Sequence, residues 1–139
     1  MKVRILNTLK KLRKNEGMTL IEIMIVVAII AILGAIVMPN IMNMPKKARV
    51  QAAKQSINNL KLALENYSLS NAKYPTTDEG LEALVSEGLL KEKDLNDPWG
   101  NPYQYTSPGE HDADYDIYSY GADGKEGGEG FDADITSWE

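Results

Sequence analysis

The sequence predicts an α+β protein in which a long N-terminal helix packs on a small antiparallel β-sheet. Three observations predict this fold. Residues 18–38 form an almost uninterrupted apolar run, residues 39–72 keep apolar side chains at spacings of three and four, and residues 103–106 and 114–120 alternate in polarity. The first two patterns are typical of one helix with an apolar half and an amphipathic half, and the third is typical of short strands.

The apolar half is long enough to cross a membrane. Residues 18–38 are apolar except for Thr19 and Glu22, and about 20 apolar residues span a bilayer as a helix. Pro39 follows and is expected to bend the chain. The helical pattern then resumes over residues 39–72, where one face is apolar and is expected to pack on the rest of the chain. This face comprises Ile41, Met44, Ala48, Ala52, Ala53, Ile57, Leu60, Leu64 and Tyr67.

Residues 73–139 are predicted to form the globular part. Thr76 and Glu79 fit a capping box that opens a short helix ending at Gly88. Turn signals around residues 97–102 and 107–109 separate the two strands. In the second strand, Tyr115, Ile117 and Ser119 are predicted on one face, with Asp116, Tyr118 and Tyr120 on the other. The glycine- and aspartate-rich tail ends with Ile135 and Trp138, which are expected to dock back on the sheet.

The composition limits the chemistry. The 139 residues leave room for one domain and one additional element. There is no cysteine and only one histidine, His111, which excludes disulfides, thiolate metal sites and a histidine-rich zinc cluster. His111 is expected in an exposed loop and Trp99 in the core. Because no Ser/His/Asp set or carboxylate pair is recognisable, the protein is not expected to be an enzyme.

Charge is distributed unevenly along the chain. Residues 1–17 contain six basic residues and one acid, a net charge of +5, whereas residues 18–139 contain nine basic and 19 acidic residues, a net charge of −10. A basic start, an apolar run and an acidic body are typical of an exported chain whose N-terminus stays inside. The acidic body excludes nucleic acid as the main partner, because phosphate groups repel it.

The junction between the basic start and the apolar run predicts an unusual processing site. A secretory signal is cut after its apolar stretch, at a small-x-small site, and this stretch continues into the amphipathic half without such a site. The sequence KNEG|MTLIEIMIVVAIIAIL resembles the type III signal of type IV pilins and type II secretion pseudopilins. The resemblance implies that a membrane aspartyl peptidase, the prepilin peptidase, removes the leader 1–17 after Gly17 and then N-methylates Met18.

Glu22 is the one charged residue inside the apolar run. A carboxylate deep in a membrane helix is unfavourable by about 2.5–3.5 kcal/mol and is a functional candidate by default. Thr19 and Glu22 also fit a capping box, so Glu22 could cap the helix. The resemblance implies that Glu22 pairs with the N-terminal amine of a neighbouring subunit, or of its own chain, during assembly. The two roles are compatible.

The globular part carries a second resemblance. Its segments YPTTDEGL, DPWGNPY and SPGEH, in this order after a pilin-type helix, resemble the major pseudopilin of type II secretion systems along nearly all of residues 17–139. Type IV pilins commonly carry a C-terminal disulfide, and the absence of cysteine favours the pseudopilin. The resemblance implies a pilin-like fold, anchored by 18–38 in the bacterial inner membrane with its C-terminal part in the periplasm.

The acidic C-terminal loop, residues 121–135, has two interpretations. Its composition alone favours a flexible, solvated loop, although carboxylates on a glycine-rich loop are also ligands that suit calcium. The resemblance implies one Ca²⁺ in this loop, with Asp123, Asp132 and Asp134 at the matching positions. An EF-hand at Asp112 to Asp123 is excluded, because Ile117 stands where that motif needs glycine.

The resemblance also implies the partners. We expect a homopolymer that forms a pseudopilus and drives protein export. Further expected partners are minor pseudopilins, the prepilin peptidase, the inner-membrane assembly platform and the lipid bilayer, but no nucleic acid. A type IV pilus subunit for adhesion, motility or DNA uptake is one alternative. A membrane-tethered calcium-binding module or enzyme with an uncleaved anchor is another.

Overall fold

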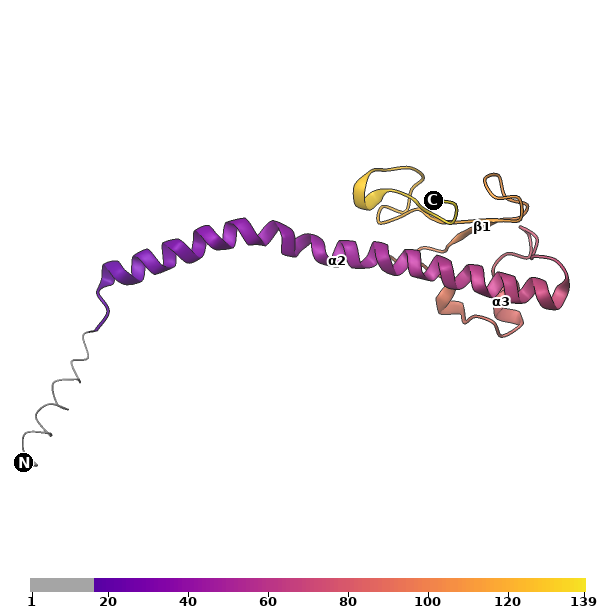
Figure 1. The fold of residues 1–139 in the computed structure, drawn as a ribbon, viewed down its shortest axis with the longest axis horizontal. Coiled ribbons are helices and arrows are strands. Elements are labelled where there is room, and N and C mark those ends of the chain that lie inside the picture. Colours follow the sequence, from indigo (N-terminus) through magenta and orange to yellow (C-terminus); the bar gives the residue numbers. More distant parts are fainter. Residues whose placement is uncertain (1–16) are drawn as a thin grey trace, which may run out of the picture. The chain divides into compact units, whose positions relative to one another are not determined.

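The computed structural model describes residues 17–139, so the predicted leader lies outside the described residues except for Gly17 (Figure 1). The predicted long helix and small antiparallel sheet are both confirmed. In chain order the elements are α2 (Leu20–Asn71), α3 (Glu82–Ser86), the 3-10 helix η1 (Glu92–Leu95), β1 (Gln104–Thr106), β2 (Asp116–Ser119), the 3-10 helix η2 (Gly130–Asp132) and β3 (Ile135–Thr136).

The long helix is continuous. The 52 residues of α2 include Pro39 and Pro45, so the helix does not break where the apolar half ends. It stops at Asn71, and Ala72 has a left-handed backbone with φ of 59°, a conformation typical of the residue after a helix end. The chain divides into two compact units at Ile41, and the second unit comprises Met42–Glu139.

The second unit has one hydrophobic core, which begins at Ala53. Ile57, Leu60 and Leu64 are at most 3% exposed, and they pack with apolar residues of the globular part such as Leu84 and Ile117. The predicted apolar face was too long, because Ile41, Met44, Ala48 and Ala52 are exposed. Helical spacing predicts which side of a helix is apolar, but not how far along that side the rest of the chain extends.

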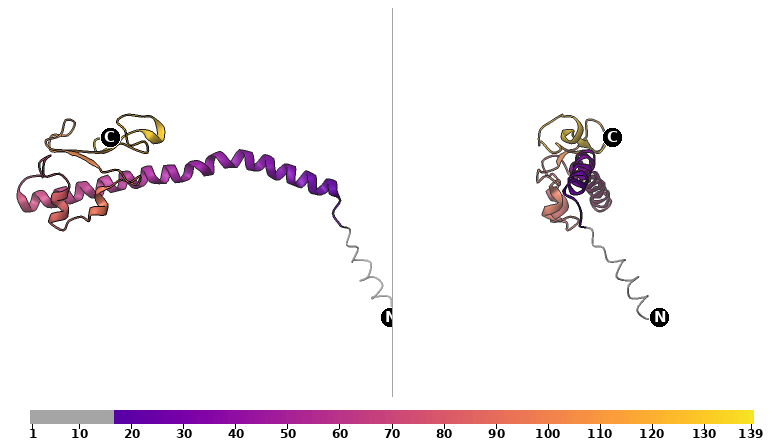
Figure 2. Two further views of the ribbon diagram at one scale, coloured as in Figure 1. Left: turned by 180° about the vertical axis from the view of Figure 1, so that it is seen from behind. Right: turned by 90° about the vertical axis from the view of Figure 1, so that its left-hand side faces the viewer.

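The three strands form an antiparallel sheet in the order β1-β2-β3. Tyr105 pairs with Ile117, and Ser119 pairs with Ile135, so the docking of the C-terminal tail on the sheet is confirmed. The strands lie along the C-terminal half of α2, while α3 lies along another side of the same half (Figure 1 and Figure 2). Burial of Ile117 and Ser119 at 0% exposure confirms the predicted inner face of the second strand.

The short helix after the long one differs from its prediction. The capping box is present, since the Thr76 backbone N–H donates to Glu79 Oε2 at 2.8 Å and the Glu79 N–H donates to Thr76 Oγ1 at 3.3 Å. However, residues 77–81 form turns, and α3 begins only at Glu82. Gly80 has a φ of 61°, which interrupts helical geometry directly after the box.

Asp116 is buried on the other face of β2 and organises the loop before it. Its carboxylate accepts hydrogen bonds from the backbone N–H groups of Glu110 at 2.8 Å, His111 at 2.9 Å and Asp112 at 2.9 Å. His111 Nδ1 lies 3.0 Å from Oδ2, and the His111 ring stacks on Trp138 at 3.9 Å. Burial raises the pKa of Asp116, but the hydrogen bonds from residues 110–112 outweigh it and lower the pKa to about 2.

We expect Asp116→Asn to lower the unfolding free energy of the second unit by about 3 kcal/mol. One side of the amide would present N–H groups to backbone N–H donors, which leaves a buried mismatch. Because the folded pKa is depressed, the carboxylate stabilises the parent fully above about pH 4, and this contribution is lost as the pH falls toward about 2. Urea unfolding at pH 7 and pH 3 measures both effects.

The exposed Asp114→Asn is the matched control for Asp116→Asn and should leave stability unchanged at both pH values. Equal unfolding free energies for Asp116→Asn and the parent at pH 7 would contradict the assigned role of the buried carboxylate.

Candidate functional site

The predicted cleavage site precedes the helix and is open. Gly17, Met18 and Thr19 lie outside α2, and all three are exposed. Among residues 17–139, no atom lies within 4 Å of the position that a Cβ on Gly17 would occupy, and Met18 is 65% exposed. The described part of the chain therefore leaves room for an enzyme to approach the peptide bond between Gly17 and Met18.

The start of α2 is held by the predicted capping box. The Thr19 backbone N–H donates to Glu22 Oε2 at 2.8 Å, and the Glu22 N–H donates to Thr19 Oγ1 at 3.3 Å. The Thr19 hydroxyl also donates to Glu22 Oε2 at 3.1 Å. Glu22 therefore caps the helix within a single chain. The same carboxylate is exposed, so its second oxygen can receive another donor.

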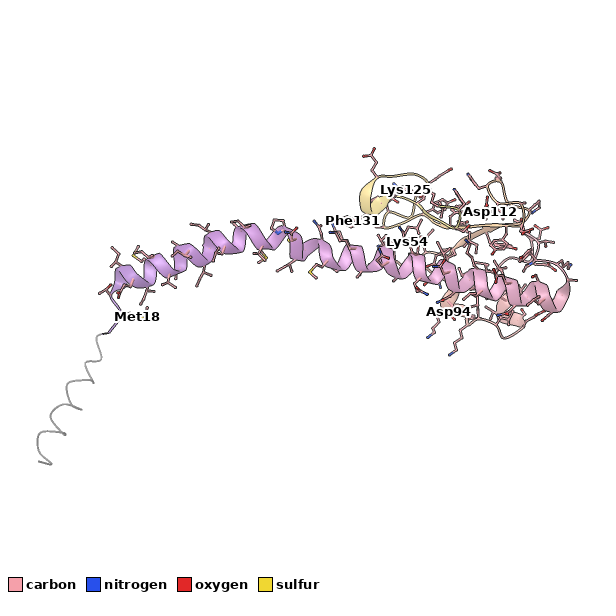
Figure 3. The ribbon with its side chains drawn as sticks, viewed as in Figure 1. Met18, Lys54, Asp94, Asp112, Lys125 and Phe131 are labelled. Carbon is pink, nitrogen blue, oxygen red and sulfur yellow. The ribbon has the colours of Figure 1, made fainter. Side chains whose placement is uncertain are left out.

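The apolar half of α2 has no partner within the part of the chain that the structure describes. Every large apolar side chain from Met18 to Met38 is at least 47% exposed. Figure 3 shows side chains projecting from both visible edges of this half of the helix. Among residues 17–139, α2 is the one helix long and apolar enough to cross a membrane. An exposed apolar surface of this extent marks a membrane or protein interaction site.

Asp97 fixes the position at which the acidic loop begins. It is 5% exposed, and its Oδ1 accepts hydrogen bonds from the backbone N–H groups of Trp99 at 3.0 Å and Asn101 at 2.9 Å. The Ser119 hydroxyl, at the end of β2, donates to Asp97 Oδ2 at 2.6 Å, and the Gly121 N–H donates to Ser119 Oγ at 3.2 Å. These bonds join the turn at residues 97–101 to the first residue of the loop.

The three predicted calcium ligands occupy different settings in the loop. Asp123 is exposed, and its Oδ1 accepts a hydrogen bond from the Lys125 N–H at 3.1 Å. Asp132 is exposed on η2. Asp134 is half-buried, and its Oδ2 accepts from the Gly127 N–H at 3.0 Å. Within residues 17–139, the structure gathers no group of three His, Cys, Asp or Glu side chains that could hold a metal ion.

The chemistry of the loop nevertheless fits a hard cation. Asp134 Oδ1 is buried and has no hydrogen-bond partner among the described residues, and such an orphaned carboxylate oxygen is unfavourable unless a donor or a cation meets it. Backbone carbonyl oxygens also lie close to two glycines of the loop. A Cβ on Gly121 would lie 2.6 Å from the Ala133 carbonyl oxygen, and a Cβ on Gly128 would lie 2.4 Å from the Asp132 carbonyl oxygen. Carboxylates and carbonyls are the ligands that Ca²⁺ uses.

Comparison with known proteins identifies the family. Residues 40–138 match the family described as "Type II secretion system (T2SS), protein G", and residues 12–38 match the "Prokaryotic N-terminal methylation motif". The chain belongs to the type II secretion system protein G family. The methylation motif covers the predicted cleavage site and the apolar run, and the roles of Gly17, Met18 and Glu22 stay predictions.

Relatives match nearly the whole chain. The type II secretion system core protein G of Pseudomonas aeruginosa is 48% identical, with 91% of this chain and 97% of the relative covered. The core protein G of Vibrio cholerae is 47% identical, with 94% and 96% covered. A crystal structure of the major pseudopilin from the type 2 secretion system of enterohaemorrhagic Escherichia coli is 36% identical, with a TM-score of 0.60 over 72% of this chain and 95% of that chain.

Two structural residues of this family member were not predicted. For Asp97 the turn signals predict only a turn, although an aspartate that starts a turn containing Pro and Gly also indicates an Asx-turn, in which its side chain accepts the backbone N–H two residues later. For Asp116 the alternation of the strand predicts an outer-face position, and nothing in the local sequence predicts that residues 110–112 fold over it.

Proposed function

We propose that this chain is the major pseudopilin of a type II secretion system, a structural subunit that polymerises into the pseudopilus and drives protein export. The observation that carries the proposal is the unequal burial of α2. Its C-terminal half forms the core of the second unit, whereas its apolar half is exposed along its full length. Family membership over residues 40–138 identifies the kind of assembly that uses such a helix.

The exposed helix has two successive environments in this proposal. Residues 18–38 first hold the subunit in the inner membrane, with the second unit in the periplasm, and the charge order of the sequence favours this orientation. The helices then leave the lipid and pack on one another in the filament. Because both environments are apolar, van der Waals packing and polar pairs, rather than the hydrophobic effect, drive helix association.

Processing and partners follow from the same proposal. The prepilin peptidase cleaves after Gly17 and methylates Met18, so each subunit enters the filament with a new N-terminal amine. Minor pseudopilins and the inner-membrane assembly platform then act on the mature subunit. Calcium binds in the C-terminal loop, where Asp123, Asp132 and Asp134 supply carboxylate oxygens. The ion would neutralise these side chains and fix the loop.

Gly17→Leu is expected to leave the chain uncut, because a peptidase must approach the scissile backbone closely and leucine blocks that approach. No atom of the described residues crowds Gly17, so the substitution should not disturb the described fold. The mass of the chain in membranes that contain the peptidase measures cleavage. Gly34→Leu adds the same side chain at another uncrowded glycine and should mature normally. Normal maturation of Gly17→Leu would contradict the assigned signal.

Deletion and complementation of the gene test the function itself. Loss of the chain should stop export of the secretion system's substrates, and the parent gene should restore export. Overproduction of the parent should yield filaments that contain the mature chain. Loss of surface adhesion or motility with unchanged export would instead identify a type IV pilus subunit.

A further inference from the structure

A groove of about 450 Å³ lies at the beginning of the second unit. Lys46 and Arg49 line it from α2, Trp99 lines it from the Asp97 turn, and Glu129, Phe131 and Asp132 line it from the segment around η2. Lys46 Nζ lies 5.6 Å from the centre of the Phe131 ring, within the range of a cation–π contact. Figure 3 shows Phe131 beside α2 on the side of the unit where its helix begins.

The two cations of this groove follow the apolar run closely in the sequence. Residues 23–45 are 23 consecutive uncharged residues, and Lys46 is the first charged residue after Glu22. At 1.5 Å per residue, the apolar run 18–38 extends about 31 Å, close to the hydrocarbon thickness of about 30 Å, and Lys46 follows it by eight residues, or about 12 Å. Side chains on a helix point toward its N-terminus, and long basic side chains near the end of a membrane helix extend to the interface. When the apolar run spans the bilayer, Lys46, Lys47 and Arg49 can therefore reach the outer phospholipid headgroups.

The side chains at this level suit that environment. Lys46 and Arg49 are exposed, and neither forms a salt bridge within residues 17–139. Trp99 and Phe131 are only partly buried. Tryptophan is enriched at membrane interfaces, because its ring is apolar and its N–H is polar, and Phe131 adds apolar surface beside it. Basic residues are disfavoured on the translocated side of a membrane helix. The three that follow the span here, Lys46, Lys47 and Arg49, are therefore candidates for binding an anionic group.

We propose that this groove binds the phosphate of an anionic phospholipid headgroup, with Lys46 and Arg49 around the phosphate and the two aromatic rings against the interface. The contact holds the second unit on the membrane before the subunit is extracted into the filament. The proposal rests on the proposed function, because it requires residues 18–38 to be in a bilayer. Glu129 and Asp132 line the same groove and their carboxylates oppose the binding of an anion. Removal of the Glu129 charge should therefore strengthen binding.

Tryptophan fluorescence of the full chain in vesicles tests this proposal. Trp138→Phe leaves Trp99 as the single tryptophan, since the chain has two. The protein is reconstituted into phosphatidylcholine vesicles with or without phosphatidylglycerol, each with a nitroxide-labelled lipid at headgroup depth. We expect stronger quenching of Trp99 in the anionic vesicles, and weaker quenching when salt is raised. Trp138→Tyr is a second background, because Trp138 stacks on His111.

Matched variants separate the groove from overall charge. Lys46→Gln and Arg49→Gln should each reduce about fivefold the fraction of protein whose Trp99 is quenched at headgroup depth. Glu129→Gln should increase this fraction. Lys73→Gln removes an exposed cation outside the groove and should change nothing.

Flotation of the vesicles in the same samples separates the two proposals. Protein that does not float with the vesicles would overturn the membrane anchor and the proposed function. Anchored protein whose Trp99 is quenched equally in neutral and anionic vesicles would overturn the groove alone. Quenching that follows the protein-to-lipid ratio rather than lipid charge would assign the groove to a second copy of the chain and also overturn the lipid proposal.

Discussion

Glu22→Gln should stop filament assembly while the helix cap and the second unit stay intact. The capping box requires an acceptor at residue 22 for the Thr19 N–H, and the carboxylate provides it at 2.8 Å. Glutamine keeps an acceptor oxygen and is itself a normal capping-box residue. It removes only the charge that would pair with the N-terminal amine of a neighbouring subunit. The variant therefore separates capping from assembly.

The expected effect is large because the amine would stay charged without its partner. Removing one member of a buried ion pair destabilises a structure by about 3–5 kcal/mol. At about 1.4 kcal/mol for each factor of ten, a loss of about 4 kcal/mol per subunit contact raises the concentration needed for assembly roughly a thousandfold. Membrane insertion should stay equal or improve, because a carboxylate inside an apolar helix opposes insertion.

Filament yield and membrane retention are the two measurements. Glu22→Ala, which loses both the cap and the charge, should assemble as poorly as Glu22→Gln, and both should be retained in the membrane. Glu65→Gln removes an exposed carboxylate from the second half of α2, outside the apolar run, and is the matched control. Filaments of Glu22→Gln at the parent's yield would show that Glu22 is a helix cap and no more.

The long helix could be predicted because its signals are local. The two predicted halves form one helix, α2, which ends at Asn71, so the predicted boundary at residue 72 coincides with the left-handed Ala72. The cap formed by Thr19 and Glu22 depends on residues three apart, so it too could be predicted. The extent of the core could not, because the exposure of Met44 and Ala48 depends on where the C-terminal residues fold back.

The acidic loop is flanked by one contact that the sequence predicts and one that it does not. The docking of β3 could be predicted from Ile135, because isoleucine is usually buried and the polar tail around it offers no apolar contacts. The hydrogen bond from Ser119 to Asp97 could not, because it joins residues 22 positions apart that each resemble ordinary turn or strand residues. Local patterns therefore identify which residues could bind a cation, while tertiary contacts decide how those residues are held.

Calcium is expected to raise the melting temperature of the second unit by about 10 °C or more, through the C-terminal loop. Residues 122–130 are all exposed, so few apolar contacts offset the backbone entropy of ordering them, which is about 1–2 kcal/mol for each residue. Carboxylates at Asp123, Asp132 and Asp134 would also repel one another if they converged without a cation. A bound Ca²⁺ removes the repulsion and supplies a partner for the orphaned Asp134 Oδ1.

The size of this effect follows from binding linkage. At a hundredfold excess of calcium over its Kd, a site present only in the folded state adds about 2.7 kcal/mol of stability. For a unit of this size, each kcal/mol corresponds to about 4–8 °C. Thermal unfolding of residues 42–139 with calcium, with magnesium and with chelator measures the shift. Magnesium should do less, because it requires a smaller and more regular octahedral site.

Asp123→Ala should abolish most of the calcium shift, because it removes a carboxylate ligand and leaves the core untouched. Asp114→Ala removes an exposed carboxylate from outside the loop and should keep the full shift. In cells, Asp123→Ala should also impair secretion, because a loop without its cation is not fixed for subunit contacts. A melting temperature that is the same in chelator and in millimolar calcium, for a folded parent unit, would assign the loop to the solvated acidic interpretation and remove calcium from the assembly mechanism.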